Sequence, residues 1–465
     1  MDREKTFIRS MLVYTMGTVI PRLSHFVLLP LYTAYLTTSE YGSFDLVSAY
    51  ISIFVPLATL ELQQATFRFL LDVSEEDDLK KKTIISSSII AFISPTIIFA
   101  FVAYLPILKI NRNLAIFLYL SFVLASILEM LRMITRGLKK NKSFSYNSIL
   151  QAIFTIISMI VMLIILKTGI SGALLANCIV YFVTIVFLLF DVKIYRYVDL
   201  KLFDIDVLKR LLKYSLPIIP TATASWILTL SDRWILSVSI GLSANGIYAA
   251  ANKIPQIIGL GVTVFNLSWQ ESAAIASKDG DSDYYYSKMF KESLDAISSI
   301  AIIVVAFSPF LFKLLVNEEF IEAFPHMLIL LLAYYYSCCS AFFDGIYIAK
   351  YETKKQSVGY LFAAVINLCV NLIYVKRIGI FAASVSTLVS YLTLYLIRCI
   401  DIRRRHNIAI SFLHNSIYSL ILIAFLVIAY FNQVYVNLVL CTLSISVFFI
   451  RYRERILFLL GKLKK

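Results

Sequence analysis

Charge is scarce in this sequence: Asp, Glu, Lys and Arg make up only 15% of the 465 residues, while 60% are hydrophobic. Soluble domains carry charge on about a quarter of their residues, so this composition excludes a soluble globular protein. The connections between the apolar segments are short, and none has the size of a soluble catalytic domain. We therefore expect an all-α, polytopic membrane protein without catalytic residues.

Motifs for nucleotide hydrolysis, metal binding and signal cleavage are also missing. No Gly-x-x-x-x-Gly-Lys-[Ser/Thr] segment occurs, so direct ATP hydrolysis is not expected. A lone Asp204-x-Asp206, a pattern by which many glycosyltransferases hold a metal and a nucleotide sugar, is expected instead to cap a helix. The first apolar run lacks an Ala-x-Ala cleavage pattern and should be retained. The cysteines lie in or beside apolar segments without metal-ligand spacing, which predicts no metal site; they are Cys178, Cys338, Cys339, Cys369, Cys399 and Cys441.

Long apolar runs dominate what is present. A transmembrane helix needs about 20 apolar residues to cross about 30 Å of hydrocarbon. By this measure the sequence predicts fourteen spans, near residues 8–36, 44–70, 84–105, 114–135, 145–166, 170–192, 212–240, 246–276, 293–316, 324–349, 357–375, 379–400, 411–430 and 434–450.

The net charge of +14 follows from where the Lys and Arg residues lie. Most of them stand in alternate connections and in the C-terminal tail, whereas the connections 37–42, 241–246 and 431–433 carry none. This distribution obeys the positive-inside rule and predicts that both termini are cytoplasmic. Nucleic acid is therefore not expected as a partner, and membrane lipids are.

The chain contains an internal repeat. Gly246 stands 204 residues after Gly42, and Gly379 stands 210 residues after Gly169, in each case in similar surroundings. The corresponding spans start on the same side, which predicts two six-helix lobes in a parallel repeat about an axis along the membrane normal. The expected domains are an N-terminal lobe (1–192), a cytoplasmic amphipathic linker helix (193–211), a C-terminal lobe (212–400), and a helix pair with a basic tail (401–465).

Cations inside the spans are candidate functional residues, because a charge in hydrocarbon is costly. Arg22 lies about 20 Å from either end of its span, too deep for its side chain to reach water. Arg68 lies near a cytoplasmic span end, and Arg233 and Lys253 approach outer span ends. We consider these four residues candidates for binding an anion, and the guanidinium group suits phosphate or pyrophosphate.

Acidic residues at depth are the second set of candidates: Asp45, Glu61, Asp232, Glu271 and Asp344. A carboxylate in a low-dielectric cavity changes its charge state easily and can take up a proton or help to bind Na⁺. We select Glu61, Asp232 and Asp344 as candidate ion-coupling residues; an open alternative is that Asp232 neutralises Arg233. Arg132 is expected to be structural and to pair with Glu129, one helical turn away.

Four short segments together resemble the polysaccharide (O-antigen type) flippases of the multidrug/oligosaccharidyl-lipid/polysaccharide (MOP) exporter superfamily. They are the proline-bearing first span with Arg22, the turn Ser39-Glu40-Tyr41-Gly42, Asp232-Arg233 late in span seven, and Asn245-Gly246-Ile247-Tyr248-Ala249 opening span eight. The resemblance implies two six-helix bundles facing each other in a V, as in MATE transporters, plus two C-terminal helices.

The resemblance also implies a function. An undecaprenyl-pyrophosphate-linked oligosaccharide, the repeat unit of an O-antigen, capsule or exopolysaccharide, would pass from the cytoplasmic to the outer leaflet of a bacterial inner membrane by alternating access. No cofactor is expected; a proton or sodium gradient would supply the driving force, and polysaccharide polymerase machinery is an expected associate. The alternatives are a lipid II flippase, a multidrug antiporter, whose cationic substrates would favour an acidic pocket, and a membrane glycosyltransferase or polymerase, which would need a larger loop.

Overall fold

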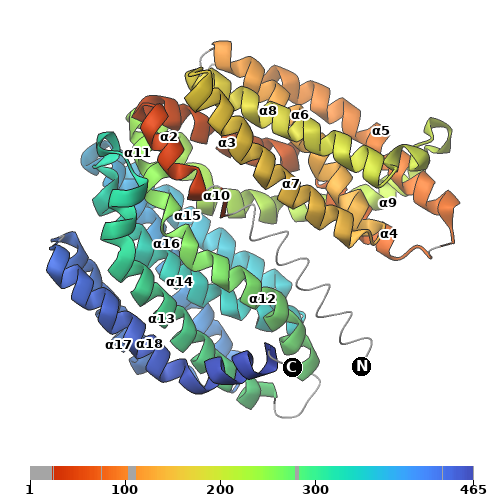
Figure 1. Ribbon diagram of the computed structural model, residues 1–465. Helices are drawn as coiled ribbons and strands as arrows, with labels where there is room; N and C mark the ends of the chain where they lie inside the picture. Colours follow the sequence, from red (N-terminus) through yellow and green to blue (C-terminus); the bar gives the residue numbers. More distant parts are fainter. Residues whose placement is uncertain are drawn as a thin grey trace. The chain divides into compact units, whose positions relative to one another are not determined.

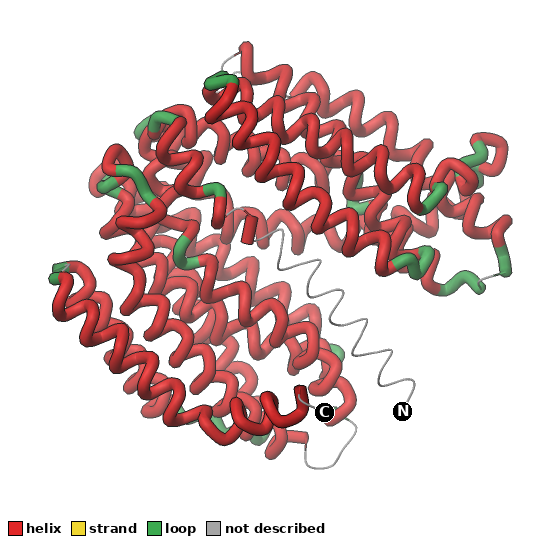
Figure 2. The backbone as a smooth tube through the Cα atoms, viewed as in Figure 1, coloured by secondary structure: helices red, strands yellow, loops and turns green. Residues whose placement is uncertain are grey.

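The computed structural model describes residues 23–24, 26–74, 76–102, 112–277, 282–431 and 433–463. Throughout these ranges the chain forms helices joined by short loops, without a strand (Figure 1), and Figure 2 shows the same helices as a continuous tube. Among the residues described, nine helices are long and apolar enough to cross a membrane. The expected all-α fold is thus confirmed, and the chain is a polytopic membrane protein.

Contacts between helices divide the chain into two units, residues 1–249 and 250–465. The first contains α2 (Leu29–Tyr35), α3 (Thr38–Ala58), α4 (Leu62–Leu71), α5 (Asp78–Val102), α6 (Arg112–Gly137), α7 (Asn141–Ile160), α8 (Gly169–Asp191), α9 (Ile205–Ser215), α10 (Ile219–Ser239) and most of α11 (Leu242–Lys253). The second contains α12 (Gln256–Ala276), α13 (Ser282–Leu315), α14 (Ala323–Ala349), α15 (Thr353–Ile378), α16 (Ile380–Arg405), α17 (Phe412–Tyr430) and α18 (Val434–Leu463). The predicted lobe boundaries at residues 192 and 212 stay a prediction, since units of contact need not coincide with units of repetition.

The linker helix predicted between the lobes is α9. The carboxylate of Asp204 accepts hydrogen bonds from the backbone N–H groups of Asp206 and Val207, at 2.7 Å and 3.2 Å. This is the helix cap that the sequence predicts in place of a catalytic Asp-x-Asp site. The apolar side chains of Val207 and Leu211 are buried against α4 and α5. The apolar face of α9 therefore packs on α4 and α5, and the position of this helix at the membrane surface stays a prediction.

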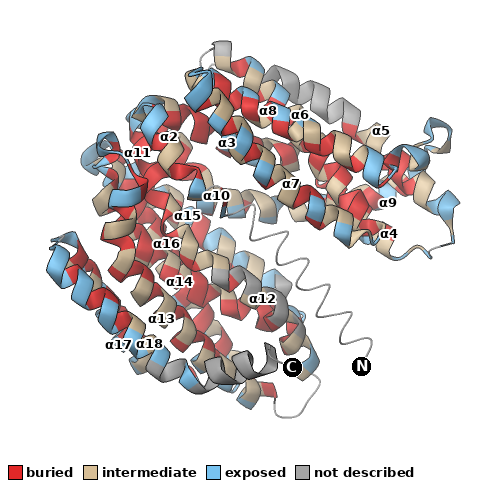
Figure 3. Cartoon of the chain, in the orientation of Figure 1, coloured by how far each residue is buried: buried red, intermediate tan, exposed pale blue. Residues whose placement is uncertain are grey.

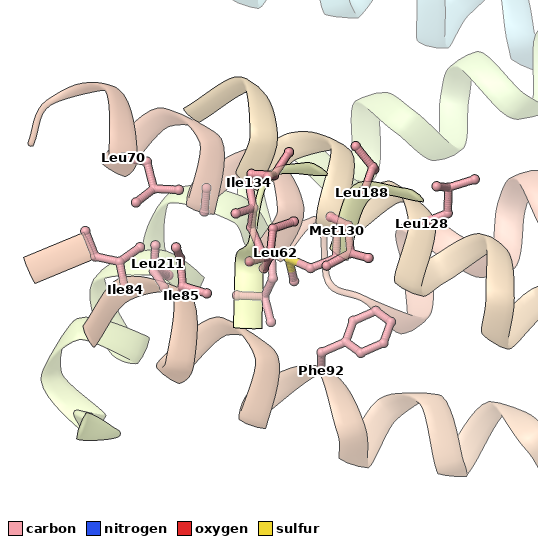
Figure 4. Packing of buried hydrophobic residues seen from close by; sticks show 14 of the residues in the cluster. Leu62, Leu70, Ile84, Ile85, Phe92, Leu128, Met130, Ile134, Leu188 and Leu211 are labelled. Atoms are coloured by element: carbon pink, nitrogen blue, oxygen red, sulfur yellow. The ribbon is translucent and has the colours of Figure 1, made fainter. Parts of the chain in front are cut away.

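A hydrophobic cluster holds this part of the first unit together (Figure 4). Leu62 and Leu70 of α4 meet Ile84 and Ile85 of α5 and Leu211 of α9 in it. The segment before α9 is tied to α5 by hydrogen bonds as well, because the hydroxyls of two buried serines, Ser86 and Ser87, accept from the backbone N–H groups of Asp199 and Asp204. The linker is thus fixed to the first unit by both apolar and polar contacts.

Three predicted boundaries are wrong. The segment Ser39-Glu40-Tyr41-Gly42 is the first turn of α3 and not a loop, because the side chain of Thr37 and that of Glu40 form a reciprocal cap on its start. The span predicted over 44–70 is broken at Thr59–Glu61, so that α3 and α4 are separate helices. Span 246–276 is likewise divided at Pro255, between α11 and α12, because proline lacks the backbone N–H that a continuous helix needs.

The repeat that aligns Gly169 with Gly379 is visible in the backbone of the two helices that these residues start. Gly169, at the start of α8, has φ of +59°, and Gly379, at the start of α16, has φ of +62°. Glycine adopts such values at no steric cost, whereas other residues adopt them rarely. The two glycines that the repeat aligns therefore have the same structural role, because each reverses the chain between two antiparallel spans.

In the second unit, α14 is buried along most of its length, while α17 leaves one face exposed (Figure 3). α14 packs against α12, α13 and α16, and both α17 and α18 pack against α13. Polar contacts fix α17 in place: the hydroxyl of Tyr418 donates to Asp295 at 2.8 Å, and the hydroxyl of Tyr335 donates to Asn415 at 3.1 Å. The helix pair α17 and α18 is therefore held in this unit by packing on α13 and by the hydrogen bonds of α17.

Candidate functional site

A buried polar cluster joins α3, α10 and α11 in the first unit. Nε of Arg233 on α10 lies 2.9 Å from Oδ2 of Asp45 on α3, and both side chains are at most 10% exposed. Nη1 of Arg233 also donates to the carbonyl oxygen of Thr229 at 3.0 Å. The hydroxyl of Tyr248 on α11 donates to Oδ2 of Asp232 at 2.8 Å. Two carboxylates and one guanidinium group are thus held together away from solvent.

The ion pair of Arg233 is not with its neighbour in sequence. The carboxylate that meets its guanidinium belongs to Asp45, 188 residues earlier, while Asp232 accepts from Tyr248. The position of Arg233 near a span end indicated a side chain that reaches water. In the structure this side chain is buried, with 5% of the residue exposed. Because a buried pair that loses one partner is strongly destabilised, Asp45 competes with any anion for the guanidinium of Arg233.

Next to this cluster, α3 and α11 cross at two glycines that the repeat aligns. A Cβ atom on Gly42 would lie 1.9 Å from the carbonyl oxygen of Leu242, and one on Gly246 would lie 1.9 Å from that of Thr38. Thr38 precedes Gly42 by four residues, as Leu242 precedes Gly246, so the two contacts are equivalent. Nδ2 of Asn245 donates to the carbonyl oxygen of Gly42 at 2.7 Å. The two copies of the motif therefore pack on each other about a local two-fold relation.

A cavity of about 350 Å³ lies among α3, α4, α6, α7 and α8. Glu61 lines it at the break between α3 and α4, where Leu60 and Glu61 have φ of 51° and 54°. Such values are uncommon for residues other than glycine, and they cluster at functional sites. Nε2 of Gln63 donates to Oε2 of Glu61 at 2.9 Å. Glu61 therefore sits at an interrupted helix with room for water or an ion, and not within a continuous span.

Arg132 lies on the wall of the same cavity, together with Glu129. Its Nε donates to Oδ1 of Asn147 at 2.9 Å and its Nη2 to Oε1 of Gln151 at 2.6 Å, both on α7. The sequence predicted a structural role for Arg132 through pairing with Glu129 on the same helix. In the structure its hydrogen bonds connect α6 to α7. The same cavity is lined by the guanidinium of Arg132 and by the carboxylates of Glu61 and Glu129.

The other predicted cations lie in different surroundings. Arg68 on α4 has a half-exposed side chain and forms an ion pair with Asp72 at 2.6 Å. Lys253 is the last residue of α11 and is partly buried. Arg22 lies outside the described residues. Within the first unit, the structure separates Arg68, which is at the surface, from Arg233, which is buried; the anion-binding role of all four cations stays a prediction.

In the second unit, Asp344 is saturated with partners. Its Oδ1 lies 2.8 Å from Nη2 of Arg398, whose side chain is 1% exposed. Gln356 and Tyr360 donate to the same carboxylate at 2.8 Å and 3.0 Å. Nη1 of Arg398 donates to the carbonyl oxygen of Ser340 at 2.9 Å. This network ties α14, α15 and α16 together. The sequence pattern did not indicate Arg398, because it stands close to the basic end of its span.

We predict that Asp344→Asn lowers the amount of folded protein, because it leaves the guanidinium of Arg398 buried without its carboxylate, at a cost of about 3–5 kcal/mol. Changing both residues, as Asp344→Asn with Arg398→Gln, should restore much of the loss. The measurement is the membrane abundance and the thermal unfolding midpoint of the solubilised protein. Normal abundance of Asp344→Asn together with lost activity would instead assign Asp344 to coupling.

A second ion-pair network lies at the end of α16 and in the connection before α15. Arg405 contacts both Asp401 and Glu352. Partial burial raises the pKa of Glu352, but the hydrogen bond and the charge of Arg405 outweigh it and hold the pKa below its usual value. Glu352 is therefore ionised at neutral pH and helps to fasten this connection to α16.

A family model described as "Polysaccharide biosynthesis protein" matches residues 7–269. A search of curated proteins finds no match. Among solved structures, the chain is similar to an inward-facing multidrug resistance MATE family transporter of the MOP superfamily, with a TM-score of 0.69 and 13% identity over 85% of this chain and 98% of that one.

Two further structures have the same fold. An outward-facing multidrug resistance MATE family transporter of the MOP superfamily gives a TM-score of 0.59 at 14% identity, over 85% of this chain and 95% of that one. A mutant of the Vibrio cholerae MATE transporter VcmN gives 0.59 at 13% identity, over 87% and 98%. The expected MATE-like fold is confirmed by these similarities.

Proposed function

We propose that this chain, which belongs to the polysaccharide biosynthesis protein family of the MOP superfamily, is a flippase for an undecaprenyl-pyrophosphate-linked oligosaccharide. The substrate would be the repeat unit of an O-antigen, capsule or exopolysaccharide, carried from the cytoplasmic to the outer leaflet of a bacterial inner membrane. The observation that carries the proposal is the combination of this family with a MATE-like transporter fold. Family and fold are those of transporters, and the substrate is our inference.

The chemistry of the substrate fits the charges of the chain. A polyprenyl tail can stay in the bilayer while its charged head crosses in a water-filled, cationic space between the repeats. Arg22, with Arg68, Arg233 and Lys253, would hold the pyrophosphate, since a guanidinium group can bind two of its oxygens at once. The buried pair with Asp45 gives Arg233 a conditional role: it becomes available when Asp45 releases it.

For coupling we favour Glu61 over Asp232 and Asp344. Glu61 lines a cavity of about 350 Å³ beside Glu129, so proton or Na⁺ uptake there would relieve the repulsion between two carboxylates. Asp344, in contrast, has a buried guanidinium as its partner, and Asp232 accepts from Tyr248. Binding at Glu61 would act on the break between α3 and α4, and through α3 on the pair of Asp45 with Arg233.

The experiment is complementation of a deletion strain. The chain should restore surface polysaccharide and remove the lipid-linked intermediate that accumulates without it. Glu61→Gln should lower surface polysaccharide at least tenfold at normal abundance, because the amide cannot change its charge. The matched control is Glu322→Gln, which removes an exposed carboxylate and should be neutral. Full activity of Glu61→Gln would contradict coupling at this residue.

A lipid II flippase is the second candidate, since it would carry the same pyrophosphate on the same kind of lipid. The deletion strain separates the two. Loss of surface polysaccharide in viable cells supports the proposal, whereas accumulation of peptidoglycan precursor with cell lysis would favour lipid II. The proposal also includes association with polysaccharide polymerase machinery. This association would appear as co-purification of the protein with the polymerase.

A further inference from the structure

A second cavity, of about 450 Å³, lies in the second unit, where the first half of α13 meets the segment between α16 and α17. Its polar lining includes Lys291, Arg403 and His414, and its apolar lining includes Phe290, Leu294 and Ile410. None of the described residues that line it is acidic. The cavity thus combines positive charge with an apolar wall, which no feature of the proposed transport mechanism requires.

The length of α13 places this cavity at the level of lipid headgroups. The helix has 34 residues, or about 51 Å at 1.5 Å per residue, which exceeds the roughly 30 Å of a hydrocarbon core. Its charged residues lie in the first half, up to Asp295, and then none occurs until Lys313. The apolar half therefore fits the hydrocarbon, and Lys291 lies about one turn beyond the hydrocarbon boundary.

The walls of the cavity are fixed by hydrogen bonds. The backbone N–H of Ala409 donates to the hydroxyl of Ser287 at 2.9 Å, and that of Asn407 donates to Oδ2 of Asp283 at 3.1 Å. Nε2 of His414 lies 2.7 Å from Oδ1 of Asp295. Asp283 and Asp295 of α13 are thus engaged by the walls, and the charged side chains of the lining, Lys291 and Arg403, are cations.

We propose that this cavity binds an anionic phospholipid, with the phosphate against Lys291 and Arg403 and an acyl chain along Phe290, Leu294 and Ile410. Basic pockets between transmembrane helices on the cytoplasmic side are suited to such headgroups, and each cation near an anionic surface contributes attraction. Free phosphate would use the two cations but not the apolar wall. The bound lipid would join α17 to α13 and so fasten the appended helix pair.

The test uses the purified full-length protein in detergent, with the thermal unfolding midpoint as the readout. Phosphatidylglycerol should raise the midpoint and saturate, whereas phosphatidylcholine and inorganic phosphate should have little effect. The double variant Lys291→Gln with Arg403→Gln should weaken the apparent affinity for phosphatidylglycerol at least tenfold. The matched control is Lys376→Gln with Arg377→Gln, an exposed pair in the last turn of α15, which should respond like the unmodified protein.

Three results would overturn the proposal. An equal response to phosphatidylcholine would show a general effect of lipid, and saturation by inorganic phosphate alone would show a site for a free anion. An unchanged response of the double variant would place the lipid elsewhere. Should the double variant not fold, Lys291→Gln alone must still weaken the response, and native mass spectrometry of retained phosphatidylglycerol gives a second readout of the same variant.

Discussion

Gly42→Ala is expected to destabilise the protein by about 2–6 kcal/mol, a large effect for one methyl group. The new Cβ would lie 1.9 Å from the carbonyl oxygen of Leu242 and 2.8 Å from the backbone nitrogen of Gly246, so α3 and α11 must separate. Separation also weakens the buried hydrogen bond from Asn245 to Gly42. Thermal unfolding of the solubilised protein and its amount in membranes measure the effect.

Two companion variants make this prediction specific. Gly246→Ala should be as damaging as Gly42→Ala, because the contacts of the two glycines are equivalent. Gly259→Ala, inside α12, should be neutral or stabilising by up to about 1 kcal/mol, since among the described residues outside its own helical turn no atom lies within 4 Å of the added Cβ and alanine favours the helix. If Gly42→Ala unfolded at the temperature of the unmodified protein, the crossing of α3 and α11 would be wrong.

Arg22→Ala is expected to abolish the export of polysaccharide while the protein still inserts at its normal level. Arg22 lies about 20 Å from both ends of its predicted span, so leaving it unpaired in lipid would cost several kcal/mol. A substrate pyrophosphate in a water-filled space removes that cost during transport. Arg22→Lys should recover only part of the activity, because lysine keeps the charge but not the two-pronged geometry. Surface polysaccharide at native expression, normalised to protein abundance, is the measurement.

A structural role of Arg22 gives a different pattern. If Arg22 formed a fixed ion pair, Arg22→Ala would lower abundance, and neutralising its partner would restore it. Glu61 and Asp344 are the acids expected as such a partner, and the structure pairs Asp344 with Arg398, so Glu61→Gln is the rescue variant to test first. Arg233→Ala serves as the comparison: it leaves Asp45 buried without its ion-pair partner and should lower abundance whatever the role of Arg22.

Local features of this fold could be predicted from sequence because neighbouring residues determine them. The cap at Asp204 and the break at Pro255 depend on residues within one or two turns of each other. The repeat of Gly169 and Gly379 was visible as spacing, and the shared positive φ shows its physical cause. The presence of long apolar spans follows from the thickness of the membrane and therefore also needed no tertiary information.

The pairing of charges could not be predicted, because it depends on which helices become neighbours. Arg233 pairs with Asp45 across 188 residues, although Asp232 is adjacent in sequence. The sequence placed Gly42 in a turn. In the structure Gly42 lies in α3, and its lack of a side chain allows α11 to approach closely. Arg398 resembled one more cation at a basic span end, and only its burial against Asp344 reveals its structural importance. In each case the deciding contact is with a residue distant in sequence.

Flipping by the purified protein in liposomes tests the central claim most directly. An undecaprenyl-pyrophosphate-linked oligosaccharide with a labelled sugar is placed in one leaflet, and its exposure to a membrane-impermeant reagent is followed under a proton or sodium gradient. We predict exposure that depends on the unmodified protein and falls to the protein-free rate with Arg22→Ala. A rate no faster than in empty liposomes, or an undiminished rate with Arg22→Ala, would contradict the account.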